Sequence, residues 1–92
     1  MQYTFEWDAA KARANKAKHR VSFDEAATAF ADPLSHTIPD PDHSRSEERY
    51  VLLGMSSRRR LLVVPHVERG DRIRIISARL ASKREKRLYE EG

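Results

Sequence analysis

The chain has 92 residues, a formal net charge of +4 and no cysteine. A chain of this length forms one domain with a small core, since single domains typically hold about 50 to 200 residues, and without cysteine it has neither disulfides nor thiolate metal sites, which fits a reducing compartment. No apolar run is long enough to span a bilayer and no signal-peptide core is present. We therefore expect one cytoplasmic domain over residues 1–92, with no membrane partner.

The positive charge is concentrated in the second half of the chain. Residues 1–46 hold six Lys/Arg against seven Asp/Glu, a net −1, whereas residues 47–92 hold twelve against seven, a net +5. Such an asymmetry predicts that the C-terminal half faces a polyanion. The alternative is a solvated basic surface that only aids solubility.

The first predicted helix runs from Ala9 to about His19. It follows the segment Tyr3–Trp7, whose alternating polarity indicates an extended stretch or a sheet edge. Asp8 is a suitable N-cap for the helix. Asn is a poor residue for a helix interior, so Asn15 needs a specific role, either a hydrogen bond to a neighbouring backbone group or contact with a ligand.

A second, shorter helix is predicted from Phe23 to about Phe30. Ser22 and Glu25 have the spacing of a capping box, and Asp32-Pro33 ends the helix. The pattern of Leu34–Ile38 then predicts a strand.

The remainder predicts further strands and a last helix. Residues 39–44 form a loop, because two prolines cannot join a central ladder. A buried strand is expected at Tyr50–Met55. A hairpin of Leu61–Val67 and Arg72–Ala78, joined by Glu68–Asp71, follows it. The last element is a helix capped by Ser82 and Glu85 that ends near Tyr89. We predict an α+β fold: two N-terminal helices, an antiparallel sheet of about four strands and a C-terminal helix.

The second hairpin strand carries cations on one face. Ile73, Ile75 and Ser77 point to one side, and Arg72, Arg74 and Ile76 to the other. Arg74 fits a phosphate contact and a structural role equally well. For Arg72, protection of a strand edge from aggregation is the simpler interpretation.

Arg79 lies between the last strand and the last helix. Near a helix N-terminus its planar guanidinium would suit a phosphate. The alternative is a salt bridge from Arg79 to Glu68 or Asp71.

His66 and His19 are candidate proton carriers, because histidine titrates near neutral pH. His66 is placed at the end of a central strand, where the covering thins and a ligand can enter. Glu68 is a candidate general base, or only a solvated turn residue. Tyr89 would stack on a base, contact phosphate, or pack back on the sheet.

Several other chemistries lack support. The run Asp40-Pro41-Asp42-His43 has neither the Gly nor the terminal Glu of a calcium loop. No spacing for zinc, no Gly-rich phosphate loop and no Gly-x-Ser-x-Gly elbow is present. We expect no metal and no cofactor.

The separated motifs together resemble the BrnT family of bacterial toxins over nearly the whole chain. The matching residues are Phe5–Asp8 with Lys11, Asn15 and Lys18-His19, then Val21–Ala26, Asp32-Pro33, Glu68–Asp71, Arg74–Arg79, Glu85 and Tyr89. The run from Arg74 to Arg79 is the strongest part of this resemblance.

The resemblance implies a RelE-like ribonuclease fold, RNA as substrate, and a BrnA-type antitoxin whose complex with the toxin, and not the toxin alone, binds operator DNA. The catalytic residues it implies are Lys18, His19, Glu68, Arg69, Arg74, Arg79 and Tyr89. Further expected RNA contacts are Arg72, His66, Lys83, Arg84 and Arg87.

Two functions remain open. A metal-independent ribonuclease toxin would activate the ribose 2′-hydroxyl against the adjacent phosphate, and arginines would stabilise the phosphorane. The alternative is a non-catalytic nucleic-acid-binding or autoregulatory module that uses the same basic face. The ribonuclease hypothesis requires that Arg69, Arg74 and Arg79 gather around one phosphate. It also requires that they are not paired with carboxylates of the same chain.

Overall fold

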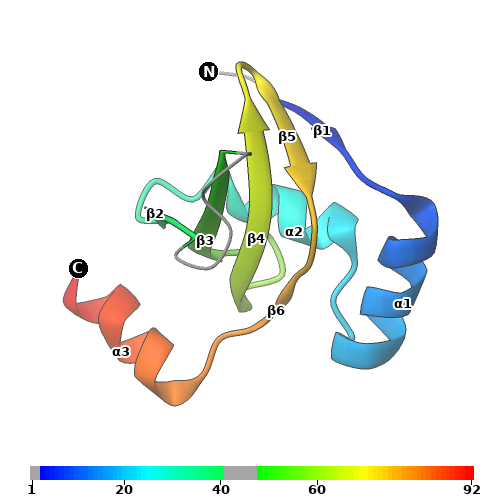
Figure 1. The fold of residues 1–92 in the computed structure, drawn as a ribbon. Coiled ribbons are helices and arrows are strands. Elements are labelled where there is room, and N and C mark those ends of the chain that lie inside the picture. Colours follow the sequence, from blue (N-terminus) through cyan, green and yellow to red (C-terminus); the bar gives the residue numbers. More distant parts are fainter. Residues whose placement is uncertain (1–2, 41–47) are drawn as a thin grey trace.

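A twisted sheet separates two helical layers in the computed structural model, which describes residues 3–40 and 48–92 (Figure 1). The helices are α1 (Ala9–His19), α2 (Phe23–Ala29) and α3 (Lys83–Glu91). The strands are β1 (Thr4–Glu6), β2 (His36–Pro39), β3 (Arg49–Met55), β4 (Leu61–Arg69), β5 (Arg72–Ile75) and β6 (Arg79–Leu80). The strand order is β1-β5-β4-β3-β2, with β6 paired to β4 beyond β5.

The three helices begin where local chemistry predicts. The Asp8 carboxylate accepts hydrogen bonds from the N–H groups of Ala10 and Lys11, and Ser22 caps α2 by accepting from the Glu25 N–H. At α3 the capping box is complete in both directions. The predicted helices are therefore confirmed, because each start depends on residues close in sequence.

The prediction of about four antiparallel strands was only partly right. The sheet has six strands and is mixed, since β1 pairs parallel to β5 with Thr4 opposite Arg72. The sequence pattern identified an extended segment at Tyr3–Trp7 but not its partner, which is almost seventy positions away in the chain. β5 is consequently an internal strand, so Arg72 does not guard a sheet edge.

The predicted strand Arg72–Ala78 is broken after Ile75. Its partner strand has Pro65 at that level, and the Pro65 carbonyl accepts from the N–H groups of both Ile76 and Ser77. Proline has no N–H to return, so the ladder cannot continue there. The chain bulges and rejoins β4 as β6, with Arg79 opposite Val63.

The core lies between the sheet and the layer of α1 and α2. Phe23 and Ala26 from α2 pack against Leu62, Val64 and other buried residues of the sheet. Within β5, Ile73 and Ile75 are buried while Arg72 and Arg74 are exposed, as the alternation predicts.

Asn15 fastens α1 to the chain just before β6. Its side-chain amide donates to the carbonyls of Val21 (3.0 Å) and Ala78 (2.9 Å), and its Oδ1 accepts from the Ala78 N–H and the Ser77 hydroxyl. These bonds confirm the backbone role and leave no amide hydrogen for a ligand.

The other face of the sheet carries α3 (Figure 1). No residue of α3 is buried, and polar side chains provide its main attachments to the domain. The Tyr89 hydroxyl donates to Asp32 (2.6 Å), and Glu85 pairs with Arg79. None of the helices in the described part of the chain is long and apolar enough to cross a membrane.

Candidate functional site

Apart from His66 and Glu68, which lie within β4, the predicted site residues lie in three separate places. The end of α1 carries Lys18 and His19, the tip of the β4–β5 hairpin carries Arg69, Arg72 and Arg74, and the region of β6 and α3 carries Arg79, Tyr89, Lys83, Arg84 and Arg87.

The expected cluster of Arg69, Arg74 and Arg79 is not formed, and Arg74 and Arg79 each face an internal carboxylate, Glu6 and Glu85. The three-arginine requirement stated from the sequence is therefore not met, and a ribonuclease mechanism has to rest on a different set of residues. Arg74 lies opposite Val67 and Arg79 opposite Val63, so the two arginines are separated by four residues of β4, roughly 14 Å along a strand. The hairpin-tip cations face a different carboxylate, with Glu6 at 3.5 Å from Arg74 and 3.6 Å from Arg72. Five positions of the chain separate Arg74 from Arg79, so an unbroken extended strand would also keep the two arginines apart.

The structure removes His66 from the RNA-binding set. β4 continues to Arg69, so His66 is not at a strand end, and its side chain is 0% exposed. The ring packs between Phe30 and Tyr50, with Nδ1 2.9 Å from the Val64 carbonyl and Nε2 3.1 Å from Glu68. Glu68 lies in the strand, not in the turn, and its carboxylate is engaged with this histidine.

Lys18 and His19 occupy the last turn of α1, in the layer opposite α3. Lys18 is exposed and His19 is half-buried. No hydrogen bond or ion pair between either side chain and another residue is found among residues 3–40 and 48–92. The next residue, Arg20, is linked to the β3–β4 turn, because its carbonyl accepts a hydrogen bond from Arg60 (3.0 Å).

Arg79 forms a two-pronged ion pair with Glu85. Its Nη1 and Nη2 donate to the two carboxylate oxygens at 2.9 Å each. The alternative considered from the sequence was a salt bridge from Arg79 to Glu68 or Asp71. Arg79 does form an internal salt bridge, but its partner is Glu85. The Arg79 hydrogen bonds lower the pKa of Glu85 to about 2, and Glu85 in turn raises the pKa of Arg79. A fork that fits a carboxylate also fits a phosphate, which is the chemical interest of this position.

Tyr89, one helical turn after Glu85, makes the second polar attachment of α3. Its hydrogen bond to Asp32 raises the pKa of Tyr89 to about 12. Its ring meets the ring of His36 edge-on, with centroids 6.2 Å apart. Tyr89 thus packs back on the sheet, one of the roles predicted for it, and remains half-buried.

A row of side chains crosses the sheet beneath α3. His36 pairs with Leu53, Leu53 with Val63, and Val63 with Arg79, so all four point to the face that α3 covers. A groove of about 360 Å³ follows this row, with His36 and Glu85 both in its lining. Sequence reasoning missed His36, because the strand pairing that brings it toward Arg79 is non-local and leaves no local signal.

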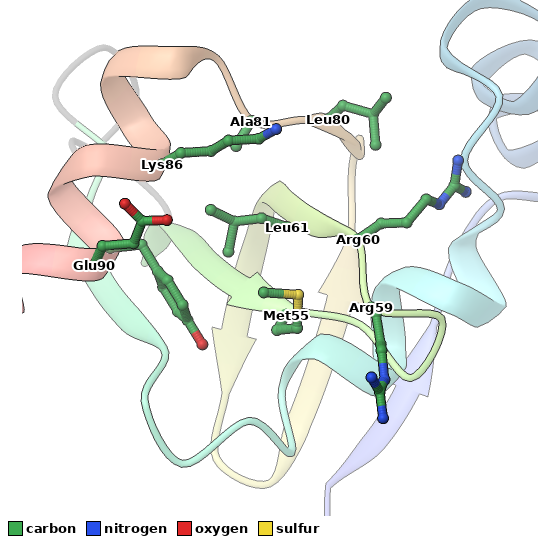
Figure 2. A pocket seen from close by; sticks show the side chains of 9 residues that line it. Met55, Arg59, Arg60, Leu61, Leu80, Ala81, Lys86 and Glu90 are labelled. Atoms are coloured by element: carbon green, nitrogen blue, oxygen red, sulfur yellow. The ribbon is translucent and has the colours of Figure 1, made fainter.

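A second pocket, of about 470 Å³, opens on the other side of α3 (Figure 2). Met55, Leu61 and Leu80 form an apolar surface, and Arg59 and Lys86 line it from the β3–β4 turn and from α3. Within the described residues no group of three or more His, Asp or Glu side chains is arranged to hold a metal. Most of the Asp40–His43 run lies outside those residues.

Comparison with known proteins gives two consistent results. The family model described as "Ribonuclease toxin, BrnT, of type II toxin-antitoxin system" matches residues 7–85. Among solved structures, the crystal structure of the Brucella abortus ribonuclease toxin BrnT matches with a TM-score of 0.68 and 21% sequence identity, covering 89% of this chain and 100% of that one. The search of curated proteins gave no match.

Proposed function

The chain belongs to the BrnT family, the ribonuclease toxins of type II toxin–antitoxin systems, and on that premise we propose that it cleaves RNA by a metal-independent, RelE-like mechanism centred on Arg79. The observation that carries the proposal is the two-pronged Arg79–Glu85 pair on the sheet face that α3 covers. His36 and Tyr89 lie along the same face.

In the proposed reaction the scissile phosphate takes the place of the Glu85 carboxylate on the Arg79 fork. The 2′-hydroxyl attacks the adjacent phosphorus, and Arg79 stabilises the doubly charged phosphorane. Glu85, released beside the reacting group, accepts the 2′-hydroxyl proton. His36 lines the same groove as Glu85 but lies three strands from Arg79, roughly 14 Å between the backbones. It is therefore assigned to supply a proton to the departing 5′-oxygen through bridging water.

The other predicted residues have different proposed roles. Tyr89 orients His36 through their edge-on contact. The exposed cations of α3, Lys83, Arg84 and Arg87, attract the RNA backbone. We assign no catalytic role to Arg69, Arg74, Glu68, Lys18 or His19, because they lie away from the Arg79–Glu85 pair or are engaged elsewhere.

The test is incubation of the purified protein with RNA in excess EDTA. The mechanism predicts a fragment ending in a 2′,3′-cyclic phosphate, and no cleavage when the nucleotide 5′ to the cut is 2′-deoxy. A His36→Gln variant should cleave RNA about 10²–10⁴-fold more slowly, the usual loss for a proton-transfer group. Cleavage that stops in EDTA and returns with a divalent ion would contradict the mechanism.

A second candidate is a non-catalytic nucleic-acid-binding module. The observation that favours it is the same ion pair, because Glu85 occupies the arginine that would have to meet phosphate. Such a module would bind RNA with a steep salt dependence and return it intact after long incubation.

We also propose that the toxin works in the cytoplasm and is neutralised by a BrnA-type antitoxin. Operator DNA would then be bound by the complex only. Co-expression with the neighbouring reading frame, followed by mobility-shift assays of the complex and of the isolated toxin on the promoter, tests both statements. Operator binding by the isolated toxin would contradict the second.

A further inference from the structure

We propose, given the RNA substrate proposed above, that the pocket between α3 and the β3–β4 turn is a nucleotide subsite that holds one base beside the cleaved bond. Its volume of about 470 Å³ is within the range of roughly 300–1,000 Å³ for small-molecule sites. Its ligand class is a nucleotide of single-stranded RNA, with the base on the apolar surface and the backbone phosphate between the cations.

The apolar part of the pocket suits the face of a base. Leu61 and Met55 lie at its centre (Figure 2), and Leu80 stays 48% exposed although it is fully apolar. Tyr89 contributes an aromatic wall. Bases bind single-strand proteins largely by stacking on aromatic side chains, and Tyr89 is the aromatic residue among those that line this pocket.

The cations of the pocket are placed to meet phosphate. Lys86 reaches over the pocket from α3, and Arg59 stands at the edge of the β3–β4 turn (Figure 2). Neither side chain forms an ion pair with another described residue. Arg60, in contrast, points away toward α2, where its Nε donates to Glu25 at 2.9 Å.

The turn that presents Arg59 is attached to α2 by hydrogen bonds to Glu25. Glu25 is buried and accepts hydrogen bonds from both Arg60 and the Ser56 hydroxyl (2.7 Å). Arg59 itself has φ of 62°, a left-handed conformation that favours glycine or asparagine and costs about 1 kcal/mol or more for other residues.

The pocket is continuous with the proposed catalytic face. Leu80 follows Arg79 in β6, although successive strand side chains point to opposite faces, and the direct link is Tyr89, which lines the pocket and meets the His36 ring edge-on. A phosphate on Arg79 would therefore have its neighbouring nucleotide on the Tyr89 side of the pocket. The pocket would select the base at one position relative to the cut.

The probe is a short, fluorescently labelled RNA made entirely of 2′-O-methyl nucleotides, which cannot be cleaved by internal attack. A series of such RNAs carries one abasic nucleotide, moved along the strand, and binding is measured by anisotropy. One abasic position should weaken binding about tenfold. The Leu80→Trp variant, which fills the pocket, should bind the intact and abasic RNAs equally.

Matched variants distinguish RNA binding in the pocket from general attraction of RNA by positive charge. Arg59→Gln should weaken binding several-fold and reduce the salt slope by about one. Arg58→Gln, in the same turn but outside the pocket and 73% exposed, should leave both nearly unchanged. Thermal unfolding checks the fold of each variant, and Leu80→Gln replaces Leu80→Trp if the larger side chain unfolds the protein.

The outcomes distinguish the subsite from the ribonuclease proposal. The subsite proposal is overturned if no abasic position weakens binding. It is also overturned if the position-dependent loss of affinity persists in both Leu80 variants. Both results count against the subsite even if unmodified RNA is cleaved. A sensitive position lost in the Leu80 variants supports the subsite even if no RNA is cleaved, in which case the ribonuclease proposal fails alone.

Discussion

At the scale of a single residue, the proposed mechanism gives Arg79 one role in the fold and one in the chemistry. Glu85 binds both prongs of its guanidinium, and in the proposal the scissile phosphate takes the place of that carboxylate. Replacing Arg79 by Ala should reduce cleavage by about 10²–10³-fold, the usual loss for a group that stabilises the transition state. The measurement is single-turnover cleavage of an RNA oligonucleotide.

Arg74 is the matched control for that experiment, because it also pairs with a surface carboxylate, Glu6. Arg74→Ala should leave the cleavage rate almost unchanged. Equal losses from the two variants would show that the hairpin tip, and not the α3 face, binds the scissile phosphate.

The Arg79–Glu85 pair also predicts a pH dependence of stability. The pKa of Glu85 falls from 4.5 to about 2 on folding, so the pair stabilises the folded protein above pH 4.5, and this contribution is lost as the pH falls toward 2. Arg79 is 43% exposed, so solvent screening reduces the effect to roughly 1 kcal/mol. Denaturant unfolding of the parent and of Glu85→Gln should differ by that amount at pH 6 and converge near pH 2.

Asn15 gives a prediction for the fold alone. Asn15→Ala leaves the Val21 and Ala78 carbonyls and the Ala78 N–H without partners in a buried place. The free energy of unfolding should fall by about 2–4 kcal/mol. Lys18→Ala, at an exposed position of the same helix, should change it by less than about 0.5 kcal/mol, and an Asn15→Ala effect as small as that would contradict the assigned role.

At the scale of elements, α3 is joined to the domain differently from α1 and α2. It has no buried residue and depends on the Tyr89–Asp32 and Arg79–Glu85 contacts. Tyr89→Phe removes the first of these. Hydrogen exchange over residues 83–91 should become faster in this variant while β4 stays protected; equal acceleration in β4 would mean that α3 is part of the cooperative core.

The elements also show what a single sequence can predict. Asp8, Ser22 and Ser82 located the three helices, because capping is decided within four residues. The alternation in β5 was predicted for the same reason. The β1–β5 pair and the interruption opposite Pro65 depend on contacts between distant segments, so no local pattern could reveal them.

The candidate site was predicted only where local motifs reached it. Arg79 and Tyr89 were identified with the correct elements. The grouping of Arg79 with Arg69 and Arg74 treated the hairpin and the helix entry as one small region, although the five residues from Arg74 to Arg79 span roughly 17 Å when extended. His36 was missed, since only the register across β2, β3, β4 and β6 places it in the row with Arg79.

At the scale of the whole molecule, the sheet assigns one face to the core and the other to the proposed RNA site. The cations of α3 and those of the hairpin tip then differ in function. Changing Lys83, Arg84 and Arg87 together to Gln should lower the salt slope of RNA binding by about three. The same change at Arg69, Arg72 and Arg74 should alter it much less, and the reverse result would place RNA on the hairpin tip.

The weak anchoring of the last helix has an evolutionary consequence. Every buried apolar side chain of the described chain precedes Arg79, so a stop codon shortly before Ser82 would discard Glu85, Tyr89 and Lys86 while sparing the whole hydrophobic interior. On the proposed mechanism, a bacterial lineage that loses the antitoxin could abolish the toxic activity by truncating the end of the gene, without removing any residue of the hydrophobic core.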